Sequence, residues 1–314
     1  MRRAVVVVTG GTRGIGAAIA RELAASCDLV LSYRSNADAA TALRAELQGL
    51  GASCELVQAD VTVESRVATV TLNRPDVRNA FNETTITELA LAFDELGRNE
   101  DVRAIVLAAN GVAFCAGADL NWMKKMAAYS DAENLDDATR LADMLRTIYL
   151  CPKPVVAKVQ GDCYAGGMGL VAACDIIVTV EEANFCLSEV KLGLIPATIS
   201  PYVIKAMGEN AARRYFLTAE RFSAREAYRI GFAHEVSTAD ELDEHVAGIV
   251  RSLVNNSPNA VAEAKVLVRD MAGKEVTDAL LLDSAERIAK IRSSLEGREG
   301  VASFLEKRKP SWLN

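Results

Sequence analysis

The chain opens with an apolar strand that runs directly into a glycine-rich turn and then a helix, and this order constrains its fold more than any other feature. Residues 4–8 read AVVVV, residues 9–16 read TGGTRGIG, and Ile15, Ile19 and Leu23 then recur at every fourth position. That spacing is typical of the buried face of a helix. The next predicted elements are a strand at 28–32, a helix at 37–50 and a strand at 55–59. This β-α-β-α-β order predicts the first half of a doubly wound, Rossmann-like fold.

The glycine turn has the context of a dinucleotide site, since it follows a strand and begins a helix. It resembles the short-chain dehydrogenase/reductase family, whose cofactor turn is TGxxxGIG. Arg13 and Arg34 stand where NADP-preferring members place cations, and residues 60–61, Asp-Val, resemble their adenine-contacting pair. The resemblance then stops. A Tyr-x-x-x-Lys occurs at residues 149–153, but no family-like Ser or Asn-Ala-Gly segment precedes it. We therefore expect weak or absent NADP binding by the Gly10–Gly16 turn, and an NADP-dependent reductase is the weaker alternative.

From residue 67 onward, short strands alternate with helices and are separated by Gly/Pro turns, which predicts an α/β body. No segment repeats at a fixed length, as a solenoid or propeller would require. The predicted elements are a strand at 67–72, a helix at 83–96, a strand at 104–107, a helix at 138–149 and helices from 243 to 305. We also predict that residues 55–61 act twice, as the third strand of the N-terminal half-fold and as the first strand of the body.

Five blocks of the body, taken in order, resemble the crotonase (enoyl-CoA hydratase/isomerase) family. They are NRPDVRNAF, FCAGAD, GDCYAGGMGL, FCLSEVKLGLIP and the final EGREGVASFLEKRKPSW. The resemblance implies a spiral of ββα units at 61–242 and a C-terminal helical oligomerisation region at 243–314, so that 61–314 forms one crotonase domain after a Rossmann-like fragment at 1–60. GADLNWM, LSEVKLGLIPA and ISPYV are most similar to hydratases of branched glutaconyl-CoA esters, such as methylglutaconyl-CoA or isohexenylglutaconyl-CoA.

The family's shared step is formation of an enolate from a CoA thioester, which requires two backbone N–H donors facing the thioester oxygen. By resemblance these donors are the amides of Ala118 and Gly166. Glycines at Gly117 and Gly166 suit this role, because a backbone without a side chain can approach a ligand closely. The implied proton carrier is Glu189, whose apolar surroundings in the sequence would raise the pKa of its carboxyl.

The chain departs from the family's two-glutamate hydratase pattern at one position. The second glutamate would fall at Gly169, which has no acid-base group. Three outcomes are open: a hydratase with one base, an isomerase that moves a proton between two carbons, and an impaired or non-catalytic CoA-binding scaffold. Asp162, Tyr164 and Ser200 are candidate substitutes for the second carboxylate.

The resemblance also implies where coenzyme A would bind. Lys124 and Lys125 could attract a distal carboxylate, although a solvated helix face is the simpler account. The expected substrate and CoA contacts are Val77, Arg78, Ala80, Ala116, Asp119, Leu120 and Gly167.

The composition limits which classes of partner and ligand we expect the chain to bind. A net charge of −7, with 35 Lys+Arg against 42 Asp+Glu, does not suit nucleic-acid binding. Two histidines and seven cysteines without a CxxC pair argue against a metal site and for reduced thiols in a cytoplasmic protein. No apolar run is long enough to span a membrane. We expect an enzyme of acyl-CoA metabolism, in fatty acid or branched amino acid degradation, that needs no cofactor beyond its CoA-bearing substrate and forms a homotrimer or hexamer.

Overall fold

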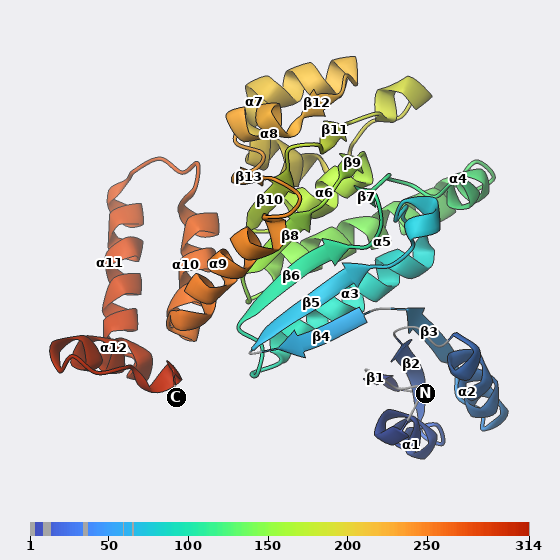
Figure 1. Cartoon of the computed structure of the whole chain (residues 1–314), viewed down its shortest axis with the longest axis horizontal. Coiled ribbons are helices and arrows are strands. Elements are labelled where there is room, and N and C mark those ends of the chain that lie inside the picture. Colours follow the sequence, from blue (N-terminus) through green and yellow to red (C-terminus); the bar gives the residue numbers. More distant parts are fainter. Residues whose placement is uncertain (1–3, 9–13, 34–36, 59, 65, 314) are drawn as a thin grey trace.

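The computed structural model of the 314-residue chain describes residues 4–8, 14–33, 37–58, 60–64 and 66–313 (Figure 1). Among these residues, the strands form three sheets, of three, six and four strands. The buried side chains form two separate clusters, one in the N-terminal fragment and one in the body. The parallel strands with intervening helices confirm the predicted α/β class.

The N-terminal fragment is a three-stranded parallel sheet with two helices. Its strands β1 (Ala4–Val8), β2 (Cys27–Tyr33) and β3 (Cys54–Gln58) pair in the order β1-β2-β3. The helices α1 (Gly14–Leu23) and α2 (Ala37–Gly49) connect them. This confirms the predicted β-α-β-α-β segment. Arg13, Arg34 and most of the glycine turn lie outside the described residues, so the expectation about NADP remains a prediction.

The junction differs from the prediction. β3 pairs with β2, whereas a separate strand, β4 (Asp60–Glu64), pairs antiparallel with β5 (Val67–Leu72) of the body. The prediction that residues 55–61 serve both sheets is therefore wrong. A tight hairpin explains the difference: Glu64 lies opposite Val67, and Arg66 takes the left-handed conformation at φ 72°. This turn allows residues 60–64 to form a complete strand of their own, separate from β3. Asp60 and Val61 belong to this hairpin.

The body contains a six-stranded sheet in the order β13-β10-β8-β6-β5-β4, parallel except at β4. β6 is buried at every position, as expected for a central parallel strand covered on both faces. Helix α9 packs against β6, β8 and β10. The strands and helix introduced here are β6 (Ala104–Ala109), β8 (Val155–Val159), β10 (Ile176–Val180), β13 (Glu235–Ser237) and α9 (Leu242–Asn255).

A smaller sheet has the order β12-β11-β9-β7. Its strands β7 (Ala113–Cys115), β9 (Asp162–Tyr164) and β11 (Asn184–Cys186) are parallel, and β12 (Phe222–Ser223) is antiparallel. The short helix α6 (Gly166–Ala172) packs against β7 and β9. This sheet therefore places the segments after three parallel strands along one edge.

The remaining helices of the body connect and cover these sheets. Helix α5 begins well before the expected position 138, because Ser130 and Glu133 form a capping box there. The first turn of the helix is polar, so apolar periodicity does not reveal it. Helix α3 packs against α5. Their bounds are η1 (Pro75–Val77), α3 (Glu83–Arg98), α4 (Leu120–Met126), α5 (Asp131–Leu150), η2 (Glu189–Leu192), α7 (Ser200–Thr218) and α8 (Ala224–Arg229).

The C-terminal region is helical, as predicted, and extends away from the sheets in Figure 1. A charged contact joins it to the body: the Lys265 Nζ donates to Asp175 Oδ2 at 2.6 Å and to the Lys153 carbonyl at 3.1 Å. The elements of this region are α10 (Pro258–Met271), α11 (Asp278–Ser293), α12 (Leu295–Leu305) and η3 (Ser311–Leu313).

Candidate active site

The three residues expected to perform the chemistry follow three neighbouring parallel strands. Ala118 comes after β7, Gly166 after β9 and Glu189 after β11. In the pairing register, β9 lies between the other two strands. The carboxyl ends of parallel strands meet at one edge of a sheet, which is where ligands bind in open α/β sheets. The topology therefore brings Ala118, Gly166 and Glu189 to the same edge, although they are far apart in sequence.

The Ala118 amide is available for a ligand. Ala118 forms a parallel bridge with Phe81, in which the Phe81 N–H donates to the Gly117 carbonyl and the Asp119 N–H donates to the Phe81 carbonyl, both at 2.7 Å. N–H groups alternate in direction along an extended segment, so the Ala118 N–H points away from Phe81. Within the described part of the chain, no protein acceptor is bonded to it.

The Gly166 amide is available for a related reason. Gly166 is the first residue of α6, and N–H groups in the first turn of a helix have no partner within the helix. Its neighbour Ala165 has φ 48° and ψ −121°, with its N–H bonded to the Cys186 carbonyl at 2.8 Å. A Cβ on Gly117 would lie 3.0 Å from the Ala165 Cβ and 3.9 Å from the Gly166 nitrogen. A side chain at Gly117 would therefore crowd the space beside the Gly166 amide.

Glu189 has the properties of a proton carrier. It begins η2, and its Oε2 atom is buried without a hydrogen-bond partner among the described residues. Burial raises the pKa of the Glu189 carboxyl, opposed only by a hydrogen bond to its own backbone. A carboxylate with no cation to satisfy it is in a costly position for structure alone, but is well suited to take up a proton.

The candidate substitutes for a second carboxylate are engaged elsewhere. The Asp162 carboxylate accepts from the Tyr164 hydroxyl at 2.6 Å and from the Asn184 backbone N–H at 2.9 Å. The Ser200 hydroxyl donates to the Ala197 carbonyl at 2.8 Å. Tyr164 and Asp162 thus satisfy each other, and Glu189 is the carboxylate at this edge whose oxygen is left without a partner.

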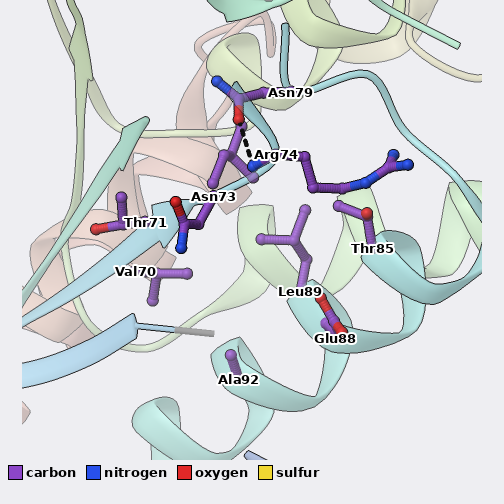
Figure 2. Close-up of a pocket in the computed structure, with 10 residues that line it drawn as sticks. Val70, Thr71, Asn73, Arg74, Asn79, Thr85, Glu88, Leu89 and Ala92 are labelled. Atoms are coloured by element: carbon purple, nitrogen blue, oxygen red, sulfur yellow. Dashed lines mark hydrogen bonds between the residues drawn. The ribbon is translucent and has the colours of Figure 1, made fainter. Parts of the chain in front are cut away.

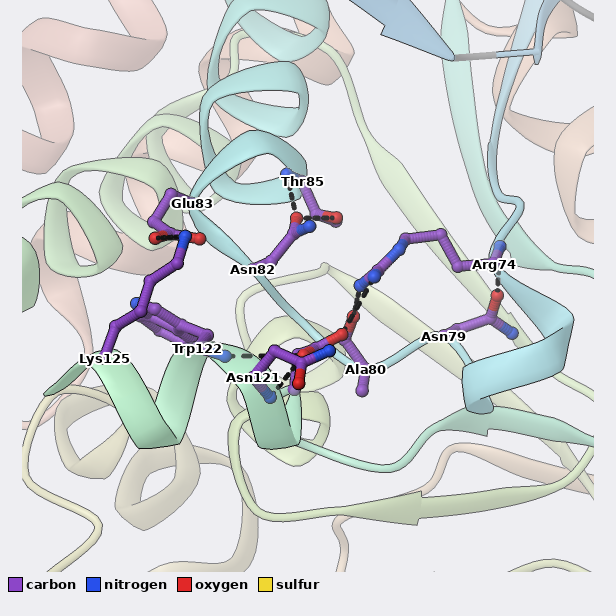
Figure 3. A network of polar contacts seen from close by, with 10 residues as sticks. Arg74, Asn79, Ala80, Asn82, Glu83, Thr85, Asn121, Trp122 and Lys125 are labelled. Carbon is purple, nitrogen blue, oxygen red and sulfur yellow. Dashed lines mark hydrogen bonds and ion pairs between the residues drawn. The ribbon is translucent and has the colours of Figure 1, made fainter. Parts of the chain in front are cut away.

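The loop expected to hold coenzyme A is braced from within by an ion pair between Asp119 and Arg74. Figure 3 shows the Arg74 side chain reaching toward Ala80. The Asp119 carboxylate caps α4 by accepting from the Asn121 N–H, and it accepts from the Arg74 guanidinium, both at 2.8 Å. Burial acts to raise the pKa of Asp119, but hydrogen bonds from Arg74, Asn121 and Trp122 hold it below the usual range. Because its backbone N–H is also bonded to Phe81, Asp119 supports the shape of this loop.

Other expected CoA contacts fall into an exposed set and a covered set. Val77 and Leu120 are exposed, and Arg78 is exposed in the left-handed conformation at φ 53°. Ala80 is buried, and its carbonyl accepts from Arg74 (Figure 3). The surface through which this loop could meet a ligand therefore includes Val77, Arg78 and Leu120. The CoA role of all the expected residues remains a prediction.

Gly167 and Lys125 also contact other residues of the chain closely. A Cβ on Gly167 would lie 2.8 Å from the Cys115 Cβ and 2.9 Å from its carbonyl oxygen, so this glycine permits close packing of α6 on β7. The Lys125 ammonium pairs with Glu83 at 2.8 Å (Figure 3). Lys124 and Lys125 are both exposed, and the two differ in that Lys125 is paired with Glu83.

Arg74 is the residue that sequence interpretation missed. It lies in the quoted block NRPDVRNAF, but nothing in that block indicates a partner at Asp119. Asn79 accepts from the Arg74 N–H at 2.8 Å, and a small hollow adjoins both residues between β5 and α3 (Figure 2).

The described residues contain no group of three or more His, Cys, Asp or Glu side chains that could hold a metal ion. Among the same residues, no helix is both long and apolar enough to cross a membrane.

Comparison with known proteins agrees with this geometry. The model of the enoyl-CoA hydratase/isomerase family matches residues 62–314, and that of short chain dehydrogenases matches residues 4–74. The short-chain-enoyl-CoA hydratase of Clostridium acetobutylicum is 31% identical over 78% of this chain and 94% of its own length. The 2,3-dehydroadipyl-CoA hydratase of Escherichia coli is 30% identical over 80% of this chain and 97% of its own.

Solved structures give the same result. The crystal structure of an enoyl-CoA hydratase from Shewanella pealeana is 44% identical, with a TM-score of 0.79 over 81% of this chain and 95% of that one. The chain belongs to the enoyl-CoA hydratase/isomerase family, as the ordered sequence blocks predicted, and it is an enzyme of that family.

Proposed function

We propose that the chain hydrates an enoyl-CoA thioester and that Glu189 is its sole catalytic carboxylate. The observation that carries the proposal is the buried Oε2 of Glu189, which has no partner among the described residues. At the same sheet edge, the amides of Ala118 and Gly166 are likewise without a protein acceptor within the described part of the chain. Ala118 and Gly166 would bind the thioester oxygen. Negative charge develops on that oxygen in the enolate, and loss of one such donor typically costs about 2.7–4 kcal/mol of transition-state stabilisation.

The proposed reaction passes its proton through one group. The Glu189 carboxylate takes a proton from water while the water oxygen bonds to the β-carbon of the substrate. The electron pair of the C=C bond moves toward the thioester, giving an enolate whose oxygen lies between the two amides. Re-formation of the carbonyl returns that electron pair to the α-carbon, which takes the proton from Glu189. The carboxylate is thereby regenerated, and one water has been added.

Isomerisation is the second candidate, and Gly169 favours it. A proton shift between two carbons needs one base and no bound water, and no carboxylate can come from position 169. The names of the relatives favour hydration, because the similar proteins from Clostridium acetobutylicum and Escherichia coli are both called hydratases. A CoA-binding scaffold without turnover is the remaining alternative.

For the substrate, we propose a branched glutaconyl-CoA ester, on the basis of GADLNWM, LSEVKLGLIPA and ISPYV. Lys124 is better placed than Lys125 to meet a distal carboxylate, because Lys125 is already paired with Glu83. Coenzyme A would lie over the exposed Val77, Arg78 and Leu120. No cofactor beyond this substrate is part of the proposal.

We also propose a homotrimer or hexamer built through the C-terminal region. Within α10 and α11, the described side chains are not buried, and in α12 only Ser303 is. Large apolar residues are instead exposed there, including Leu295 at 87% and Phe304 at 82%. Exposed apolar surface of this kind is typical of protein interfaces. Sedimentation of the purified protein would test this assembly.

The test of function is a spectrophotometric assay of the purified protein with crotonyl-CoA and 3-methylglutaconyl-CoA, combined with mass spectrometry of the products. Hydration adds the mass of one water, whereas isomerisation leaves the mass unchanged. Turnover with a mass gain of about 18 Da, the mass of one water molecule, supports the proposal. Binding of both esters without turnover would favour the scaffold alternative.

A further inference from the structure

The space beside Gly169, where a side chain would lie, is already occupied. It lies three residues after Gly166 in α6, and residues at that spacing share a helix face. A Cβ built on Gly169 would lie 2.1 Å from the Ile199 Cγ2, 2.5 Å from the Ile199 Cβ and 3.5 Å from its Cα. Non-bonded carbon atoms normally keep about 3.5–4.0 Å apart. The volume that any side chain at position 169 would need is therefore filled by Ile199.

Ile199 cannot easily yield this volume. It is 2% exposed and belongs to the main hydrophobic cluster. Its carbonyl accepts from the N–H groups of Tyr202 and Val203, both at 3.1 Å, at the start of α7. Rotation about χ1 moves the Cγ2 but leaves the Cβ where the backbone places it. Because that Cβ is itself too close, relief requires movement of the α7 N-terminus.

We propose that Ile199 is a positioning residue that prevents helix α6 from carrying a second carboxylate at position 169. Gly169 and Ile199 together then define a one-carboxylate site. The chemical half of this inference rests on the proposed function. The packing half does not, since it concerns only which pairs of side chains fit at positions 169 and 199.

Two substitutions at Ile199 separate the Cβ contact from general loss of core packing. Ile199→Ala keeps the Cβ that collides with position 169, whereas Ile199→Gly removes it. Alanine is the better helix former, by about 1 kcal/mol, so without a collision Gly169→Ala should stabilise α6. With the collision we expect Gly169→Ala to lower the thermal midpoint by about 5 °C or more, using about 2–4 °C per kcal/mol for a chain of this size.

The decisive measurement is the effect of Gly169→Ala in three backgrounds. We expect a loss of thermal midpoint in the original protein and in Ile199→Ala, and no loss in Ile199→Gly. An interaction that vanishes only when the Cβ is removed supports the inference. A Gly169→Ala protein as stable as the original, or an equal loss in all three backgrounds, overturns it.

A chemical experiment tests the catalytic half. Gly169→Glu alone should fold less stably and lose hydration, whereas Gly169→Glu with Ile199→Gly should recover at least about tenfold over the single variant and gain an alkaline limb in the pH profile, as expected for an added carboxylic acid. Equal turnover in the single and double variants contradicts the role of Ile199. If the original protein turns over no enoyl-CoA ester, the proposed function fails, while the melting experiment still decides the packing.

Discussion

The N-terminal fragment and the body each have a glycine-bearing segment after a parallel strand, but they differ in what the neighbouring strands place beside it. In the fragment, three strands pair in the order β1-β2-β3, and the chain then leaves for the next sheet. In the body, β7, β9 and β11 end along one edge, and each contributes one group. A glycine turn is thus a local feature, but a site needs the neighbouring strand ends that complete it.

The largest expected effect is at Glu189. Glu189→Gln should retain binding of a CoA ester and lose turnover, because the amide has nearly the same shape but cannot accept and return a proton. General acid-base groups contribute typically about 10²–10⁴-fold, measured as kcat/KM. The exposed Glu181, changed to Gln in parallel, is the matched control and should leave turnover unchanged. Near-normal activity of Glu189→Gln would remove this residue from the mechanism.

The next effect concerns the contact that holds the C-terminal region. Lys265→Met should destabilise the chain, because it leaves the largely covered Asp175 without its cation. Loss of one partner of a buried pair costs about 3–5 kcal/mol, and partial exposure of Asp175 places the expected loss at the lower end. Chemical denaturation measures it.

The control for Lys265 removes both charges. Burial raises the pKa of Asp175 even beside Lys265, which shows that the covered carboxyl is poorly solvated. Asp175→Asn combined with Lys265→Met should therefore recover part of the stability that the single change loses. If the double variant were less stable than Lys265→Met, the uncompensated charge would not be the cause.

A smaller effect follows from the raised pKa of Glu189. The proposed mechanism starts from the carboxylate, so kcat/KM should rise with pH and fall as pH drops through that pKa, above the usual glutamate value of about 4.3. A single carboxylate predicts one acidic limb without an alkaline limb from a second carboxylic acid. A symmetric bell with two carboxyl-type limbs would contradict the one-carboxylate site.

The raised pKa of Glu189 also affects the stability of the fold. Its effect is opposite in sign to that of an ion-paired carboxylate. A carboxyl whose pKa is higher in the folded state destabilises the fold once pH exceeds its unfolded pKa, since the charged form is disfavoured on folding. Glu189→Gln should therefore melt at a higher temperature than the original protein at pH 7. The difference should shrink as pH falls below about 4.

The smallest expected effect is in the N-terminal fragment. NADPH should bind weakly or not at all, because the half-fold lacks the strands that close the crevice at the switch point. Isothermal titration calorimetry measures this directly. Micromolar affinity would show that the glycine turn forms a working site, and would remove the contrast between the two regions.

Sequence interpretation succeeded where a local pattern determines structure. The apolar run at β1 and the strand predicted at 67–72, which is β5, are local signals, and the ordered blocks predicted the family. The start of α5 was missed, because its first turns are polar and only the capping box marks them.

The rest depends on contacts between distant segments. The partner of Arg74 is 45 positions away, and the residue that fills the space at Gly169 is Ile199, the N-cap residue of α7. No periodicity or turn pattern in one segment reports on such a contact. The junction failed for the same reason, since whether residues 55–61 form one strand or two depends on which sheet each strand joins.

The thiols beneath the candidate site offer a way to observe it at work. Cys115 and Cys186 are the last residues of β7 and β11, Cys163 is the central residue of β9, and all three are buried. Burial raises the pKa of the Cys115 thiol to about 12 and that of Cys163 well above its usual value, so neither supplies thiolate at neutral pH. Alkylation must therefore wait for this edge of the sheet to open. The rate of alkylation therefore reports how often this edge of the sheet opens locally. A CoA ester that bridges Ala118 and Gly166 should slow the alkylation.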